Sequence, residues 1–216
     1  MKNALISWSG GKDSCYAAML AQQQGYAVKG FLNILNEEGE TSRAHGIPPQ
    51  ILKQQAAAAQ LPIQMIAASW QAYEQKFTEA LQTAKKDWGI THVIFGDIDL
   101  EEHRAWEEKI CLQQGLTAVW PLWKKDRKGL VLQMIEEGMR MVIVSCNAAM
   151  GEIFIGKTLN HQVISQLEKL GIDPCGEEGE FHTLVTDCKM FQKPFDVSVS
   201  RPFLHNAFWY GQLQLT

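Results

Sequence analysis

Short apolar runs alternate with longer stretches of helical periodicity along the first two thirds of the chain. The runs predict strands at residues 4–8, 28–35, 63–67, 93–95 and 142–145, and the longer stretches predict helices at 14–24, 49–59, 70–88 and 101–114. Because a helix follows each of the early strands, these strands are expected to lie parallel in one sheet. The pattern is typical of the α/β class.

The pattern changes after residue 123, where a charged cluster at 124–128 interrupts it. Beyond this cluster a helix is predicted at 130–137 and a strand at 139–146. Two stretches near the C-terminus, 196–200 and 208–215, alternate apolar and polar residues as half-exposed strands do. We therefore expect a parallel-sheet domain over 1–123 and a smaller α+β domain over 124–216, with a ligand site in the crevice between them.

The composition argues against several classes of function. The 20 Lys and Arg and the 24 Asp and Glu give a formal net charge of -4, so a constitutive nucleic-acid binder is not expected. No apolar run approaches the ~20 residues of a membrane span, and the first residues do not form a signal peptide. We expect a cytoplasmic protein without a membrane partner. The five cysteines include no C-x-x-C pair, which favours reduced thiols over disulfides or a metal centre.

A glycine-rich run, SGGKDS, follows the first predicted strand and opens the first predicted helix. Its members are Ser9, Gly10, Gly11, Lys12, Asp13 and Ser14. Adjacent glycines let a backbone approach a phosphate closely, and the following helix N-terminus favours negative charge. The lysine adds a full charge and the serines add hydroxyl donors. The run fails the Walker A pattern, because Ile6 and Asp13 stand where that pattern needs Gly and Ser or Thr. The alternative is a simple turn between strand and helix.

A second unusual segment, DPCGEEGEFHT at 173–183, carries several acidic residues beside a histidine and a threonine. If the segment is extended, Glu178, Glu180 and His182 project to one side, since they are spaced by two. Such a group suits holding Mg²⁺, orienting an amine, or general acid-base steps. Gly179 and Thr183 complete the GEFHT portion. The alternative is a solvated acidic loop.

A third candidate is the pair Gly96 and Asp97, which ends the apolar run at 93–95. Open α/β sheets bind ligands at the carboxyl ends of their strands. A glycine there leaves room for a ribose or phosphate, and the carboxylate can bind a metal or a hydroxyl. A strand-end turn explains the pair equally well.

The SGGKDS run resembles the PP-loop of the N-type ATP pyrophosphatases. Together with Gly96-Asp97-Ile98 and the GEFHT segment, it makes most of the chain similar to the diphthine-ammonia ligase family and its prokaryotic relatives. The resemblance implies an α/β fold with a HUP-type, Rossmann-like nucleotide domain and a smaller C-terminal substrate domain. It also implies ATP and Mg²⁺ as cofactors, and cleavage of ATP between its α and β phosphates.

In that family a carboxylate is adenylated, pyrophosphate leaves, and ammonia then displaces AMP to give an amide. The implied partners are therefore ammonia and a carboxylate-bearing acceptor, either protein-borne diphthine on elongation factor 2 or another acid. The segment SRAHGIP at 42–48 stands where the family's pattern leads us to expect a Tyr-His or Tyr-Gln type segment, and this difference indicates a prokaryotic relative.

Roles follow for individual residues. We expect the six loop residues with Gly96 and Asp97 to bind ATP, and Lys12 and Asp13 to act in catalysis, with Asp13 as metal ligand or helix cap. Glu180 and His182 are expected to position ammonia or take its proton, beside Glu178, Gly179, Thr183 and His45 on the substrate side. His45, Arg43 and Ile34 are candidates for the adenine side, against the alternative of an exposed loop.

Two other functions fit parts of the pattern. A nucleotide sensor would use the same fold to bind ATP or AMP without turnover. A tRNA-modifying PP-loop enzyme would need paired cysteines or an RNA-binding appendage, and the chain has neither C-x-x-C nor a basic stripe. The sequence is also compatible with a homodimer.

Overall fold

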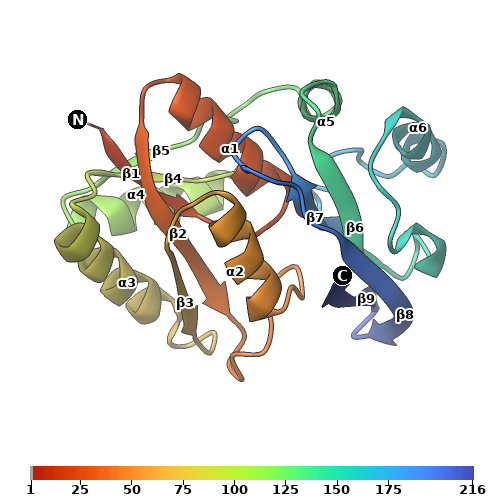
Figure 1. Ribbon diagram of the computed structural model, residues 1–216, viewed down its shortest axis with the longest axis horizontal. Coiled ribbons are helices and arrows are strands. Elements are labelled where there is room, and N and C mark those ends of the chain that lie inside the picture. The colour runs from red at the N-terminus through yellow and green to blue at the C-terminus, as the bar shows by residue number, and fades with distance from the viewer. Residues whose placement is uncertain (1) are drawn as a thin grey trace.

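The computed structural model describes residues 2–216 and contains two sheets (Figure 1). The first sheet is parallel and has the order β3-β2-β1-β4-β5. Its strands are β1 (Asn3–Ser7), β2 (Ala27–Leu35), β3 (Ile63–Ala67), β4 (His92–Ile94) and β5 (Thr117–Val119). The expected parallel α/β sheet is thereby confirmed.

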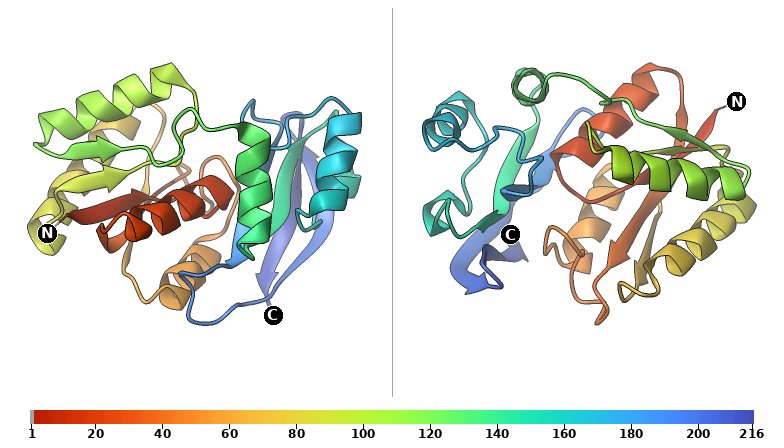
Figure 2. Two further views of the ribbon diagram at one scale, coloured as in Figure 1. Left: turned by 90° about the horizontal axis from the view of Figure 1, so that it is seen from above. Right: turned by 180° about the vertical axis from the view of Figure 1, so that it is seen from behind.

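Helices cover both faces of this sheet, as Figure 2 shows. Two of them, α1 (Lys12–Gln23) and α2 (Pro49–Ala58), share one apolar cluster, while α3 (Tyr73–Trp88) and α4 (Glu101–Gln113) share the other. The predicted helices therefore form close to their expected bounds. Burial of the apolar face of each helix against the strands supplies the main stabilisation.

The second sheet is antiparallel, with the order β7-β6-β9-β8. It contains β6 (Arg140–Asn147), β7 (Phe181–Asp187), β8 (Val197–His205) and β9 (Phe208–Leu215). Helices α5 (Arg127–Glu136) and α6 (His161–Lys169) and a 3-10 turn, η1 (Glu152–Phe154), complete this part. The expected smaller α+β unit is therefore present.

Four elements were not predicted: β5, η1, α6 and β7. Strand β5 has only three residues, too few for a periodic signal. Helix α6 does carry a signal, because Asn160 caps it by accepting a hydrogen bond from the amide of Val163 at 2.9 Å. Strand β7 (FHTLVTD) is buried along most of its length and its apolar residues do not alternate with polar ones, so it has no period-two signal.

The two parts share one continuous apolar cluster. It runs from Trp8, which stacks on Phe31 at 4.1 Å between ring centroids, through α1 to strands β6 and β7. Within it Gln55 of α2 is fully buried and makes three hydrogen bonds. Its amide nitrogen donates to the carbonyls of Gly10 (2.9 Å) and Val185 (2.8 Å), and its oxygen accepts from the indole of Trp8 (2.9 Å). This side chain therefore joins the SGGKDS loop to β7.

The order of strands fixes where a ligand can bind. The chain leaves β1 toward β2 on one side, whereas β4 lies on the other side of β1. In open α/β sheets the crevice at such a reversal, outside the carboxyl ends of the strands, is the binding site. The loop after β1 and the residues after β4 meet there.

We expect Gln55→Leu to lower the free energy of unfolding by about 3 kcal/mol, because it removes the hydrogen bonds from Gln55 to the Gly10 and Val185 carbonyls and the acceptor of the Trp8 indole. Gln22→Leu, at an exposed position of α1, should change it by less than about 0.5 kcal/mol. Urea denaturation of both variants checks this. Equal losses in the two variants would show that Gln55 does not join the two parts.

Candidate functional site

The SGGKDS loop is held in shape by its own serines. The amide of Ser9 donates to Ser14 Oγ (3.2 Å), the two hydroxyl oxygens lie 3.0 Å apart, and the amide of Gly11 donates to Ser9 Oγ (3.2 Å). Gly10 has a φ of +85°, a conformation that favours glycine. These hydrogen bonds and the conformation of Gly10 fix the shape of the loop.

Lys12 begins α1 and is 4% exposed. Its ammonium group pairs with the carboxylate of the next residue, Asp13, at 2.8 Å. Burial alone would lower the pKa of Lys12, but the adjacent carboxylate more than offsets this and holds the pKa above its ordinary value. Lys12 thus stays charged, and an anionic ligand would compete with Asp13 for it.

The GEFHT segment reaches this loop from the second sheet. Thr183 Oγ1 accepts a hydrogen bond from the backbone amide of Lys12 at 3.0 Å, and the amide of Val185 donates to the carbonyl of Gly10 at 3.0 Å. Through these two hydrogen bonds, β7 contacts the SGGKDS loop directly. The structure therefore brings together two motifs that lie about 170 residues apart.

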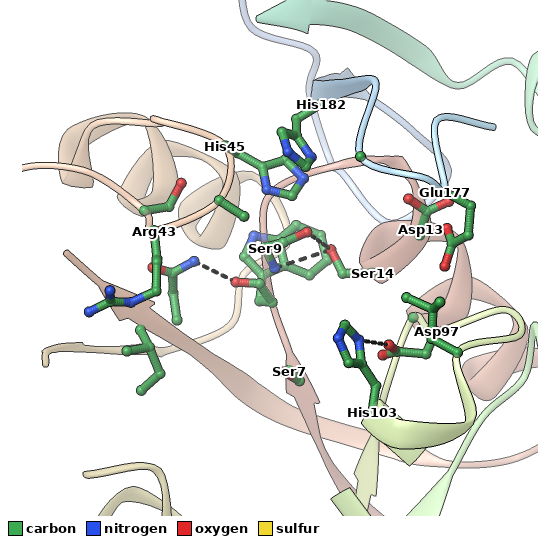
Figure 3. Close-up of a pocket in the computed structure, with 18 of the residues that line it drawn as sticks. Ser7, Ser9, Asp13, Ser14, Arg43, His45, Asp97, His103, Glu177 and His182 are labelled. Carbon is green, nitrogen blue, oxygen red and sulfur yellow. Dashed lines mark hydrogen bonds and ion pairs between the residues drawn. The ribbon is translucent and has the colours of Figure 1, made fainter. Parts of the chain in front are cut away.

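Two histidines, His45 and His182, lie side by side next to the loop (Figure 3). The rings of His45 and His182 are 4.6 Å apart, and a Cβ added at Gly11 would approach His45 Nε2 to 2.4 Å. Burial and the charge of Lys12 lower the pKa of His182 to about 4, and burial with the neighbouring His182 lowers that of His45 well below its ordinary value. Both rings are therefore neutral at pH 7.

A cleft of about 880 Å³ opens between the two parts at the carboxyl ends of β1 and β4. Its size suits a small-molecule ligand. The residues predicted for the site that line it are Ser9, Lys12, Asp13, Ser14, Ile34, Arg43, His45, Gly96, Asp97, Glu178, Gly179, His182 and Thr183. Gly10 and Gly11 are buried and are not among the lining residues, and the Gly11 amide already donates within the loop.

Glu180 does not line the cleft, so the expected common direction of Glu178, Glu180 and His182 is wrong. Its two carboxylate oxygens accept from the backbone amides of Asp173 (3.2 Å) and Glu178 (3.1 Å). The reason is local: β7 begins only at Phe181, so the preceding residues form a turn rather than a strand. Glu180 orders this turn.

Glu177 stands in the cleft instead, a residue that the spacing argument passed over. Figure 3 shows its carboxylate close to Asp13, on the side of the cleft toward Asp97. Burial, then the nearby carboxylates of Asp13 and Asp97, raise the pKa of Glu177 to about 7. A carboxyl group with such a pKa can exchange a proton at neutral pH. Only its place in the same acidic segment hinted at this.

On the same side of the cleft as Glu177, Asp97 accepts a hydrogen bond from His103 Nδ1 at 2.9 Å. Burial and the charge of Asp97 raise the pKa of the neighbouring Glu107 to about 10, and the indole of Trp120 donates to that carboxyl group at 2.5 Å. Gly96 serves packing: a Cβ there would lie 2.7 Å from the backbone nitrogen of Ser14. Its missing side chain lets β4 end against α1.

The far end of the cleft is aromatic. Trp70 is 72% exposed, and the guanidinium of Arg43 lies over its ring at 4.4 Å and donates to the carbonyl of Ala68. Tyr73 and Ile34 line the same end. A flat face of this kind suits a planar ring. The sequence pointed to Arg43 and Ile34 but gave no reason to include Trp70 or Tyr73.

Between residues 2 and 216 no group of three or more His, Cys, Asp or Glu side chains is arranged to hold a metal ion. In the same range no helix has the length and apolar character needed to cross a bilayer.

Comparison with known proteins gives matches over both parts. Residues 1–118 match a family described as diphthamide synthase N-terminal domain, and residues 126–214 match one described as diphthamide synthase C-terminal domain. A diphthine–ammonia ligase of Mus musculus is 27% identical over 230 residues, covering 94% of this chain and 85% of that protein. One of Homo sapiens is 26% identical with the same coverage.

A diphthine–ammonia ligase of Schizosaccharomyces pombe is 28% identical over 208 residues, which cover 86% of this chain and 34% of that protein. The chain thus spans about one third of the length of this fission-yeast relative.

We expect the stability of the protein to fall between pH 6.5 and pH 4, in part because of His182. The folded state keeps this ring neutral down to about pH 4, whereas the unfolded state takes up the proton near pH 6.5. His182→Asn should therefore lose about 1 to 2 kcal/mol less than the wild type over this interval. Urea denaturation at several pH values measures the difference. His161→Gln, at an exposed position of α6, is the control and should follow the wild type.

Proposed function

Because this chain belongs to the diphthamide synthase family, we propose that it is an ATP-dependent ligase that joins ammonia to a carboxylate and releases AMP and pyrophosphate. One observation carries the proposal. The GEFHT segment contacts the SGGKDS loop through Thr183 Oγ1 and the Lys12 amide, so groups suited to activation and to amidation face one cleft.

ATP fits the cleft in one direction. The adenine would lie at the aromatic end beside Ile34, Arg43 and Trp70, and the phosphates would lie at Ser9, Lys12 and Ser14. Lys12 would then exchange its bond to Asp13 for one to phosphate oxygen. This orientation leaves the α-phosphate between the loop and the acidic segment, near Glu177.

A magnesium ion would come with the nucleotide, since Mg²⁺ is commonly held by phosphates, water and one or two carboxylates. Asp13 is the protein ligand that fits this demand, because its Oδ1 is buried and has no hydrogen-bond partner among the described residues. The ion would neutralise charge on the phosphates, and Lys12 would add to this.

The first step makes a good leaving group. An oxygen of the acceptor carboxylate attacks the α-phosphorus and the bond to pyrophosphate breaks, giving an acyl-adenylate. Negative charge grows on the departing pyrophosphate, where Lys12 and the hydroxyls of Ser9 and Ser14 stabilise it. Ammonia then attacks the acyl carbon and AMP leaves. The named relatives suggest diphthine as the acceptor.

Ammonia is protonated at neutral pH and must lose a proton before it can attack. Glu177 is the group suited to take it, because it faces the cleft and its pKa lies at about 7. His182 is a weaker base, with a pKa of about 4, and Glu180 is engaged with backbone amides. The surrounding carboxylates of Asp13 and Asp97 would attract the ammonium ion.

We expect the protein, given diphthine-bearing elongation factor 2, ammonium and Mg-ATP, to form AMP and pyrophosphate in step with the amide. Chromatography of ATP labelled at the α-phosphate measures the nucleotide product. Lys12→Ala should lower the rate about a hundredfold, because one charge-assisted contact at the transition state is worth ~3 kcal/mol. ADP and phosphate as products would contradict the proposal.

Lys53→Ala, at an exposed position of α2, is the matched control and should turn over as the wild type does. Tight ATP binding without pyrophosphate release, with diphthine or with other candidate acids, would instead identify a nucleotide sensor.

We expect Glu177→Gln to lose amide formation with ammonium but to keep hydroxamate formation with hydroxylamine, which is largely unprotonated at neutral pH. The loss with ammonium should be about a hundredfold. Glu178→Gln is the control, since that side chain is 73% exposed and pairs with Arg127. If Glu177→Gln loses both products equally, Glu177 acts in activation and not in accepting the ammonium proton.

A further inference from the structure

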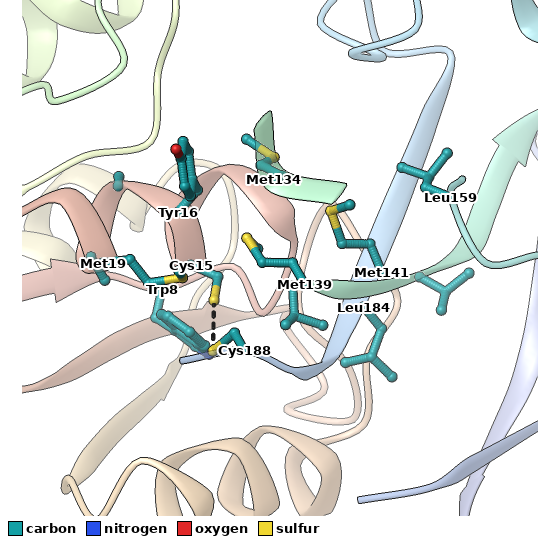
Figure 4. Packing of buried hydrophobic residues seen from close by; sticks show 14 of the residues in the cluster. Trp8, Cys15, Tyr16, Met19, Met134, Met139, Met141, Leu159, Leu184 and Cys188 are labelled. Atoms are coloured by element: carbon teal, nitrogen blue, oxygen red, sulfur yellow. Dashed lines mark hydrogen bonds between the residues drawn. The ribbon is translucent and has the colours of Figure 1, made fainter. Parts of the chain in front are cut away.

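All five cysteines are buried and none forms a disulfide in this structure, yet two of them lie in contact. Cys15 Sγ and Cys188 Sγ are 3.5 Å apart, although the two residues are separated by 173 positions in the chain. Cys15 belongs to the first turn of α1, directly after the SGGKDS loop. Cys188 follows the last residue of β7. Figure 4 shows the two sulfur atoms facing each other beside the ring of Trp8.

The two thiols differ in chemistry. The thiol of Cys15 donates its hydrogen bond to the sulfur of Cys188, and this bond, with backbone amides of Met190 and Phe191, lowers the pKa of Cys188 despite its burial. Burial raises the pKa of Cys15. A thiol with a lowered pKa in contact with a second thiol is a pairing from which disulfides form, because the first thiol can be oxidised and the second can resolve it.

We propose that Cys15 and Cys188 are a modification site, at which a hydroperoxide converts the two thiols into a disulfide that links α1 to the end of β7. Two observations carry this: the 3.5 Å contact, and the location of the pair at the seam between the two parts of the molecule. A disulfide brings its sulfur atoms to about 2.05 Å, so the two sulfur atoms have to approach each other by about 1.5 Å.

The reaction balances with hydrogen peroxide as the oxidant. The thiolate of Cys188 attacks one peroxide oxygen, the O–O bond breaks, and water leaves once the departing oxygen has taken up a proton. The sulfur of Cys15 then attacks the sulfenic sulfur of Cys188, the S–O bond breaks, and a second water leaves. Two thiols and one peroxide thus give one disulfide and two waters.

Access favours this order of events. Cys188 is 5% exposed and Cys15 is fully buried, so a peroxide reaches Cys188 first. Trp8 is 1% exposed and covers the pair, which makes the reaction slow and limits it to small oxidants. The new bond would lie next to the contact between Thr183 and the Lys12 amide and would fix the same two segments covalently.

The test uses the purified, reduced full chain and hydrogen peroxide in modest molar excess. Free thiols of the denatured protein should fall from five to three, and peptide mapping should find the peptides of Cys15 and Cys188 joined and two hydrogen atoms lighter. Dithiothreitol should restore all five thiols. The oxidised protein should unfold about 5 to 10 °C higher, because the link closes a long loop.

Variants separate the two roles. In Cys15→Ser, a sulfenic acid should be trapped by dimedone at residue 188, since its resolving partner is gone. Cys188→Ser should keep its remaining thiols at the same dose. Cys111→Ser, which alters a buried cysteine of α4, is the control and should lose two thiols like the wild type.

The proposal fails if the wild type keeps five thiols under these conditions, or if mapping joins any other pair of cysteines. The peptide map of the wild-type protein does not depend on any variant, so it can refute the proposal even if a variant fails to fold. None of these measurements uses ATP or an acceptor, so their outcome does not depend on whether the protein is a ligase.

Discussion

The carbonyl of Gly10 is the point on which the arrangement of the molecule depends. It is buried in a loop whose backbone cannot satisfy it, and it accepts hydrogen bonds from Gln55 on α2 and from the amide of Val185 on β7. An unpaired buried carbonyl is costly, so the loop is stable only with both neighbours in place. This requirement joins the parallel sheet to the antiparallel one and leaves the cleft at their seam.

The electrostatics of the cleft follow from this closure. Burial would remove the charge of Lys12, but Asp13 at 2.8 Å keeps it, and the same burial keeps the rings of His45 and His182 neutral. Lys12 therefore presents a positive charge to the cleft at the loop, while Asp97 and Glu177 present carboxyl groups on the other side. Such a division suits a substrate pair in which one member is a polyphosphate and the other is a small cation.

Structural features that depend on a local sequence pattern could be predicted from the sequence. Features that depend on contacts between residues far apart in the chain could not. The SGGKDS loop and the parallel strands could be inferred because each is short and continuous. Gln55 could not, since its partners Gly10 and Val185 lie 45 and 130 positions away. The choice between Glu177 and Glu180 also failed, because residues 177–180 form a turn and a bend before β7 instead of an extended strand.

The geometry indicates that residues of the GEFHT segment act by positioning other groups. Thr183 does not need to touch a substrate to matter, because its hydroxyl holds the amide of Lys12 and so fixes the distance between the loop and the acidic turn. Two successive reactions at one acyl group require the activating and the proton-accepting residues to keep that distance through both steps. Glu180, by binding the amides of Asp173 and Glu178, does the same for the turn that carries Glu177. In the proposed mechanism the GEFHT motif therefore mainly positions the reacting groups, and the proton of ammonium passes to Glu177, which lies just before the motif.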